Sequence, residues 1–293
     1  MKQLLDIDDY TRNESLSADA IASAASLAGF DPPNDVVAFY TSSNGGTFRE
    51  RQCRFLRLDE AIEIRDEYRD WLETFDLLPI LVADHEESDP VCVVLTGPLV
   101  GHVYQQCHDL PCRVLATCIE GLIAQIAVTP AAPLYLDAIE LSLSDNSSDQ
   151  RLQIVNQLLD QKTKDGDADS LAFELALSML SNSEVEEHFV KFHPDSNECL
   201  HALKRRLNEN DSDAARLQLA SLNSDQRDFV MEAMRLIRDA GYTPTTRTGL
   251  DIHVAEGNWH MNIPMFYERK GKADCWDKMM ERVHYFAARH KKK

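Results

Sequence analysis

One stretch constrains the fold of this chain more than any other, residues 35–64, with the sequence DVVAFYTSSNGGTFRERQCRFLRLDEAIEI. Its first part has apolar residues at helical spacing and ends at Asn44-Gly45-Gly46, a combination that tolerates positive φ and stops a helix. The run 52–58 is typical of a strand. We expect Asp59 to be the N-cap of the next helix, because a carboxylate accepts hydrogen bonds from the unpaired amides of a first turn.

The periodicity of the flanking segments extends this pattern. Apolar residues at helical spacing predict helices over 16–30, 59–75 and 114–128, and short apolar runs predict strands over 77–83, 91–96 and 101–105. The strand at 77–83 is apolar almost throughout, which places it at the centre of a sheet. The sequence therefore predicts an α+β fold with a mostly antiparallel sheet of four or more strands and helices packed on one face.

Several short motifs occur in an order that resembles a known family. The match covers roughly residues 15–128, and the motifs are Pro32-Pro33-Asn34-Asp35, Phe39-Tyr40, Asn44-Gly45-Gly46, Leu56-Arg57-Leu58-Asp59-Glu60-Ala61, and the runs 78–84, 93–95, 101–104 and 118–123. Together they resemble the SUKH superfamily of Smi–Knr type domains, which includes yeast cell-wall regulators and bacterial immunity proteins. The Gly-rich loop that the family has after its central strand is replaced here by residues 85–90. The resemblance implies a non-enzymatic domain that binds another protein.

Composition shifts divide the chain into three predicted parts. The polar run 142–149 closes a SUKH-like domain over 15–145. Residues 150–222 are helical in pattern and are expected to form a connector. Residues 223–293 contain an amphipathic helix, two strand-like runs with a turn at Glu256-Gly257-Asn258, and a last helix, which predicts a small basic α+β module of unknown role.

The charge is distributed unevenly along the chain. Residues 1–148 hold 25 Asp or Glu against 9 Lys or Arg, a net charge of −16, whereas residues 226–293 hold 9 against 13, a net charge of +4. An acidic domain repels nucleic acid and attracts a basic protein. We therefore expect a basic protein partner, a toxin or a regulated enzyme, and no nucleic acid at residues 1–222. The absence of a long apolar run or a signal-type N-terminus favours a cytoplasmic protein with no membrane partner.

Two acidic surfaces are the candidate partner-binding sites. One is expected on a loop after the strand 77–83 and the other along the outer side of the helix 59–75, and the candidate residues are Asp84, Glu86, Glu87, Asp89, Glu63, Asp66, Glu67, Asp70 and Tyr68. Tyr40 and Trp71 are further candidates for an aromatic anchor. The leading hypothesis is an immunity-type protein that occludes a toxin with an acidic surface, and a regulatory scaffold of the same family is the alternative. Plain solvation also explains exposed acidic residues.

Signatures of common enzymes are absent from the sequence. It contains no phosphate-binding glycine loop, no HExxH and no GxSxG, and its seven cysteines form no CxxC pair. We expect no catalytic residue, no bound metal and no cofactor. One alternative stays open in the C-terminal module, where Asp251, Glu268 and Lys270 resemble the acidic and lysine residues of metal-dependent nucleases.

Overall fold

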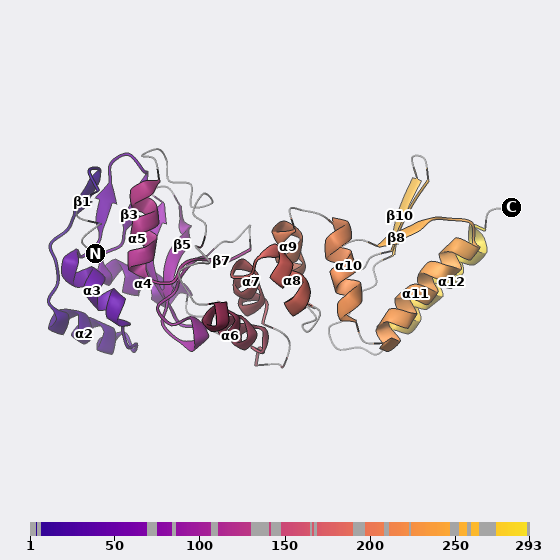
Figure 1. Ribbon diagram of the computed structural model, residues 1–293, viewed down its shortest axis with the longest axis horizontal. Coiled ribbons are helices and arrows are strands. Elements are labelled where there is room, and N and C mark those ends of the chain that lie inside the picture. The colour runs from indigo at the N-terminus through magenta and orange to yellow at the C-terminus, as the bar shows by residue number, and fades with distance from the viewer. Residues whose placement is uncertain are drawn as a thin grey trace. The chain divides into compact units, whose positions relative to one another are not determined.

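The computed structural model divides into two compact units, Met1–Met179 and Leu180–Lys293 (Figure 1). It describes residues 4, 7–68, 75–83, 86–106, 111–129, 141, 148–164, 166, 169–189, 197–207, 211–222, 224–246, 252–256, 259–263 and 274–291.

The first unit is built on a seven-stranded antiparallel sheet in which each strand pairs with the next along the chain. The predicted α+β class and antiparallel sheet are confirmed. The strands are β1 (Tyr10–Arg12), β2 (Gly46–Phe48), β3 (Cys53–Phe55), β4 (Leu77–Ala83), β5 (Glu86–Val94), β6 (Val103–Gln105) and β7 (Arg113–Ala116).

A hydrophobic core joins this sheet to the helices α2 (Ala18–Leu27), α3 (Asn34–Ser42), α4 (Leu58–Tyr68) and α5 (Ile119–Val128). Helix α5 lies across the sheet in Figure 1 and contributes four buried residues to that core. Val91 and Val93 of β5 belong to this core. Cys92 and Val94, which alternate with them along the strand, are buried as well but are not part of it. Because successive side chains point to opposite faces of a sheet, β5 is covered on both faces.

Two predicted elements differ from the structure. The helix expected over 114–128 begins only at Ile119, because Arg113–Ala116 pairs with β6 and the Cys118 side chain accepts a hydrogen bond from Gly121 N at the helix start. The prediction of an acidic loop after the strand 77–83 is also wrong. Strand β5 starts at Glu86, which pairs with Ala83, so the backbone ladder continues through a polar sequence that periodicity alone assigns to a loop.

The edge strand β7 is covered by a helix of the same unit. Glu174 and Ser178 lie one turn apart on α7 (Ser170–Ser178), and their oxygens accept hydrogen bonds from Cys112 N at 2.6 Å and Val114 N at 2.9 Å. Two side chains thus replace the strand that would otherwise pair with this edge. Helix α7 packs on α6 (Ser148–Leu159), so the first two helices of the predicted connector belong to the first unit.

The second unit contains the helices α8 (Asn182–Phe189), α9 (Asn197–Arg206), α10 (Asp211–Ser221), α11 (Ser224–Asp239) and α12 (Asp274–Arg289) and the strands β8 (Pro244–Thr246), β9 (Ile252–Glu256) and β10 (Trp259–Ile263). The antiparallel pair Trp259 and Glu256 confirms the predicted hairpin. Residues of α11, β9 and α12 share one hydrophobic core. Among the described residues no helix is long and apolar enough to cross a membrane.

Candidate functional site

A surface groove of about 580 Å³ runs between α2 and α4 in the first unit. Its lining is apolar along α2 and mixed along α4: Leu16, Ala20, Ala24, Leu27, Ala28, Asn44, Arg57, Leu58, Asp59, Ile62 and Asp66. Ile21 and Ala25 of α2 point into the core. The neighbouring face carries Ala20 and Ala24 four residues apart, and because alanine has a single methyl group this face leaves the space beside α4 unfilled.

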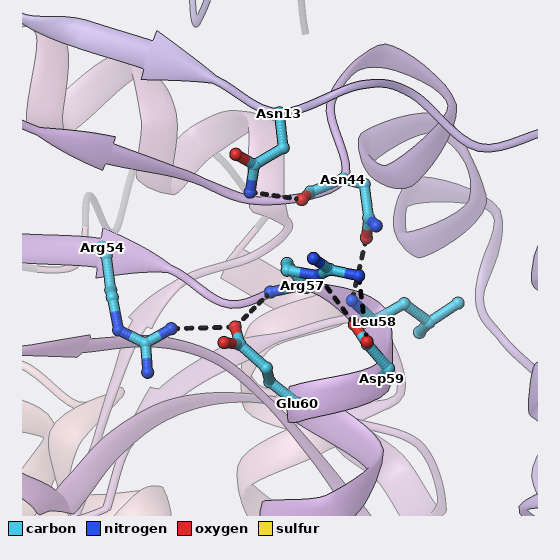
Figure 2. Close-up of polar contacts among 7 residues, drawn as sticks. All are labelled: Asn13, Asn44, Arg54, Arg57, Leu58, Asp59 and Glu60. Carbon is cyan, nitrogen blue, oxygen red and sulfur yellow. Dashed lines mark hydrogen bonds and ion pairs between the residues drawn. The ribbon is translucent and has the colours of Figure 1, made fainter.

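Hydrogen bonds surround the start of α4, where Asn44, Arg57, Leu58 and Asp59 line the groove (Figure 2). The side-chain oxygen of Asn44 accepts from Leu58 N at 2.9 Å, and the Asn44 carbonyl accepts from the Asn13 amide at 3.0 Å. Glu60 accepts from Arg57 N at 3.0 Å and from the Arg54 guanidinium at 2.8 Å. These bonds fix the loop that precedes α4 against the loop that follows α3.

The expected role of Asp59 as N-cap is not what the structure shows. Helix α4 begins one residue earlier, at Leu58, whose amide is bound by Asn44 from another loop. The Asp59 carboxylate instead accepts two hydrogen bonds from Arg57, at 3.0 and 3.1 Å. The positive charge of Arg57 at the groove is therefore balanced by Asp59.

Arg65 connects α4 to the C-terminal end of α2. Its guanidinium donates to the Ala28 carbonyl at 3.0 Å, at the C-terminus of α2, and makes two hydrogen bonds to Asp76, at 2.9 and 2.7 Å. It also lies over the Phe30 ring, 5.0 Å from the ring centroid. This buried cation fixes the separation of α2 and α4, and therefore the width of the groove.

The rim of the groove combines an exposed leucine with acidic residues. Leu27, in the last turn of α2, is 91% exposed, the highest value among the exposed large hydrophobic residues of the described chain. Helix α4 holds five Asp or Glu against one Arg in its sequence LDEAIEIRDEY. Asp59 and Glu60 pair with arginines outside the helix, and Asp66 lies 3.6 Å from Arg65. Glu63 and Glu67 are exposed as well. A large apolar side chain in water beside exposed carboxylates is a combination expected at a binding surface.

The predicted partner-binding residues and aromatic candidates fall into four groups. Glu63, Asp66 and Glu67 are exposed on α4, as expected, and Asp66 lines the groove. Asp89 is half-buried on β5. Glu86, Glu87 and Tyr68 belong to β5 and α4 but their side chains are not among those described, and Asp84, Asp70 and Trp71 lie outside the described residues.

Tyr40 does not serve as the surface anchor that the sequence suggested. It is fully buried between α3 and the sheet, with its ring 4.9 Å from that of Phe39. Burial, with a smaller contribution from the carboxylates of Glu60 and Asp59, raises the pKa of its hydroxyl, so the phenol stays neutral. A side chain without exposed surface cannot contact a partner.

No metal site is present in the part of the chain that the structure describes. No group of three or more His, Cys, Asp or Glu is placed there to hold an ion. The two described histidines of the hairpin are not paired: His253 of β9 lies opposite Asn262, and His260 lies opposite Ala255. Asp251, Glu268 and Lys270 lie outside the described residues, so the nuclease hypothesis stays a prediction.

Comparisons with known proteins found no protein similar to this chain. No protein-family model matches the chain, and no curated protein and no solved structure matches it.

The groove itself was not foreseen from the sequence. Its only local signal is the pair of alanines four residues apart on α2, followed three residues later by Leu27. A run of alanines is common in helices because of its high helix propensity. Only the position of α4 shows that these methyl groups border an open groove.

Proposed function

We propose that this chain is a non-enzymatic protein-binding protein of SUKH type whose first unit holds a basic partner in the groove between α2 and α4. The observation that carries the proposal is the pairing of an apolar groove floor with an acidic rim on α4. The occupant we infer is a partner segment with one or two apolar side chains flanked by Lys or Arg. The apolar side chains fill the groove beside Leu27, and the cations face Glu63, Asp66 and Glu67.

A protein segment fits this groove better than a small molecule does. Sites for small ligands bury 70–90% or more of the ligand surface. Here the residues at the mouth are themselves in water: the side chains of Asp59 and Asp66 are 66% and 59% exposed, and Leu27 more so. An open groove with a charged rim covers one side of a bound chain and leaves the other side for the rest of the partner.

The acidic rim also supports the immunity-type role. The net charge of −16 over residues 1–148 accelerates the encounter with a basic protein, since long-range attraction raises association rates. Occlusion requires only that the bound chain cover a basic active site. No catalytic group of this chain has to reach the partner.

The partner can be identified through the groove itself. A photo-crosslinking residue is placed at Leu27 of the full-length protein, with Glu14, an exposed position in the same unit, as the matched control. We expect one basic protein to be crosslinked from position 27 and not from position 14. Equal crosslinking from both positions, or capture of many unrelated proteins from position 27, would contradict a single groove-bound partner; the second result would favour the scaffold.

The affinity of the purified partner then tests the mechanism. The triple substitution Glu63→Lys, Asp66→Lys and Glu67→Lys is compared with a control of equal charge change at exposed positions elsewhere in the unit, Asp8→Lys, Glu14→Lys and Glu50→Lys. The rim variant is expected to weaken binding by tenfold or more at low salt, about 1.4 kcal/mol. Equal affinities of the two variants in calorimetric titrations would show that net charge, not the groove, attracts the partner.

A further inference from the structure

Helix α12, the last helix of the second unit, packs against the rest of its unit on one side only. Val283 and Phe286 of α12 are buried in the core that α12 shares with α11 and β9. The Tyr242 hydroxyl donates to the His290 carbonyl at 2.8 Å, which binds the C-terminal end of α12 to the loop after α11. The orientation of α12 within its unit is therefore fixed, and its other side faces solvent.

Arginine and tyrosine alternate along the solvent side of α12. Arg282, Tyr285 and Arg289 are exposed and follow one another at intervals of three and four residues, so they lie along one face of the helix. Tyr285 is 60% exposed. The Arg289 guanidinium lies over its ring at 5.4 Å from the centroid and donates to its hydroxyl. The exposed Glu281 precedes Tyr285 by one turn and is the acidic residue of this face.

The charge of this region differs from that of the rest of the chain. Residues 282–293 hold five Lys or Arg and no Asp or Glu, in a protein with a formal net charge of −19. In the same unit other guanidinium groups meet carboxylates: Arg235 with Glu232 and Asp239, and Arg216 with Glu186. The contact that the structure shows for Arg289 is a tyrosine, so its positive charge is not cancelled by an acid in that contact.

The helix dipole alone does not explain this arrangement. Cations are favoured in the last turn of a helix, by about 0.3–1 kcal/mol each, and the effect falls off within that turn. It accounts for Arg289 and Lys291. It does not account for a large aromatic side chain that is exposed beside Arg289.

We propose that the face of α12 formed by Arg282, Tyr285 and Arg289, with Lys291 after it, binds single-stranded nucleic acid. The cations contact successive phosphates, and the Tyr285 ring stacks on a base. An unpaired strand is favoured over a duplex because base faces are covered by stacking inside a duplex. Sequence-independent binding is expected, since the face offers charge and an aromatic ring but no set of directed donors and acceptors. The acidic first unit would repel the strand, so contact is confined to this helix.

The test measures the fluorescence anisotropy of a labelled 20-nucleotide single-stranded RNA against the full-length protein at several salt concentrations. Each neutralised phosphate contributes about −0.7 to the slope of log K against log salt for single strands. The double variant Arg282→Gln and Arg289→Gln is therefore expected to reduce the slope by about 1.4. The matched control, Arg216→Gln, removes an exposed cation from α10 and is expected to leave the slope unchanged.

The aromatic contribution is tested separately. Tyr285→Ala is expected to weaken binding about tenfold, within the 1–3 kcal/mol typical of a stacked base, whereas Tyr285→Phe keeps the ring and is expected to bind nearly as wild type. All substituted side chains are exposed, and circular dichroism verifies that the variants fold. Unchanged affinity and slope in the arginine double variant would overturn the proposal. So would equal affinity for a duplex of the same length, or binding to phosphatidylserine vesicles without binding to the RNA.

Discussion

Two arginine–aspartate pairs in the first unit have similar hydrogen-bond geometry but differ in burial. They therefore test how much burial adds to the contribution of an ion pair to stability. Arg65 and Asp76 share two hydrogen bonds, at 2.9 and 2.7 Å, and their side chains are 2% and 27% exposed. Arg57 and Asp59 share two, at 3.0 and 3.1 Å, and are 53% and 66% exposed. Contact geometry alone would predict equal effects on stability.

Burial predicts unequal effects. Arg65→Met leaves the Asp76 carboxylate and the Ala28 carbonyl without their partner. Breaking a buried pair costs about 3–5 kcal/mol, and the partial exposure of Asp76 favours the lower end, about 3 kcal/mol. Arg57→Met breaks a pair in water and should cost about 1 kcal/mol or less. The expected difference is thus about 2 kcal/mol or more for pairs that look alike.

The assay must report on the first unit alone. Of the three tryptophans, Trp71 belongs to the first unit, and Trp259 and Trp276 belong to the second. In a Trp259→Phe and Trp276→Phe background, urea unfolding followed by fluorescence reports on the unit that contains both pairs. The double variant Arg65→Met and Asp76→Leu should regain part of the loss, because removal of both charges leaves none unpaired. Equal destabilisation by Arg65→Met and Arg57→Met would refute the reasoning.

Three further changes have expected outcomes that urea unfolding in the same background can measure. Glu174→Ala leaves the buried Cys112 amide without its acceptor and should cost about 1–3 kcal/mol, whereas Glu174→Gln retains an acceptor and should cost less than half as much. Gly45→Ala places a Cβ at positive φ and 2.6 Å from a backbone carbonyl, and should cost more than Gly166→Ala, which has positive φ but no atom within 4 Å. Burial lowers the pKa of His102, so stability should fall as the pH drops below about 6.5 toward the folded pKa, and His102→Gln should flatten that decline; an unchanged pH profile would exclude His102 as the cause.

Continuous apolar runs were the most predictable part of this fold. The strand expected at 77–83 coincides with β4, because a run of seven apolar residues fits a central strand and is too short for a helix, even with Pro79 inside it. Strand β7 was missed for a related reason. Val114, Leu115 and Ala116 continue directly into the apolar face of α5, and one run of apolar residues does not show where a strand ends and a helix begins.

Short strands and contacts between distant segments were not predictable in the same way. Strands β1 and β2 have three residues each and lie in polar sequence, whereas β3 and β6, equally short, lie within the predicted strands 52–58 and 101–105. The hydrogen bonds from β7 to Glu174 and Ser178 join residues more than sixty positions apart. Nothing in the sequence of either segment indicates that the other is its partner. A polar residue on a predicted helix is read as solvent-facing unless its partner is known.

The two proposed binding surfaces differ in what the sequence could contribute to each. The acidic character of α4 is local, and Glu63, Asp66 and Glu67 were identified from composition alone; the groove beside them depends on the placement of α2 against α4 through Arg65. The cationic face of α12 needs no such tertiary contact, because the spacing of its residues and the amphipathic pattern of one helix bring them together. Substitutions at Arg65 should therefore affect partner binding through the shape of the groove while leaving nucleic-acid binding unchanged. A loss of both activities in Arg65→Met would mean that the two surfaces are not independent.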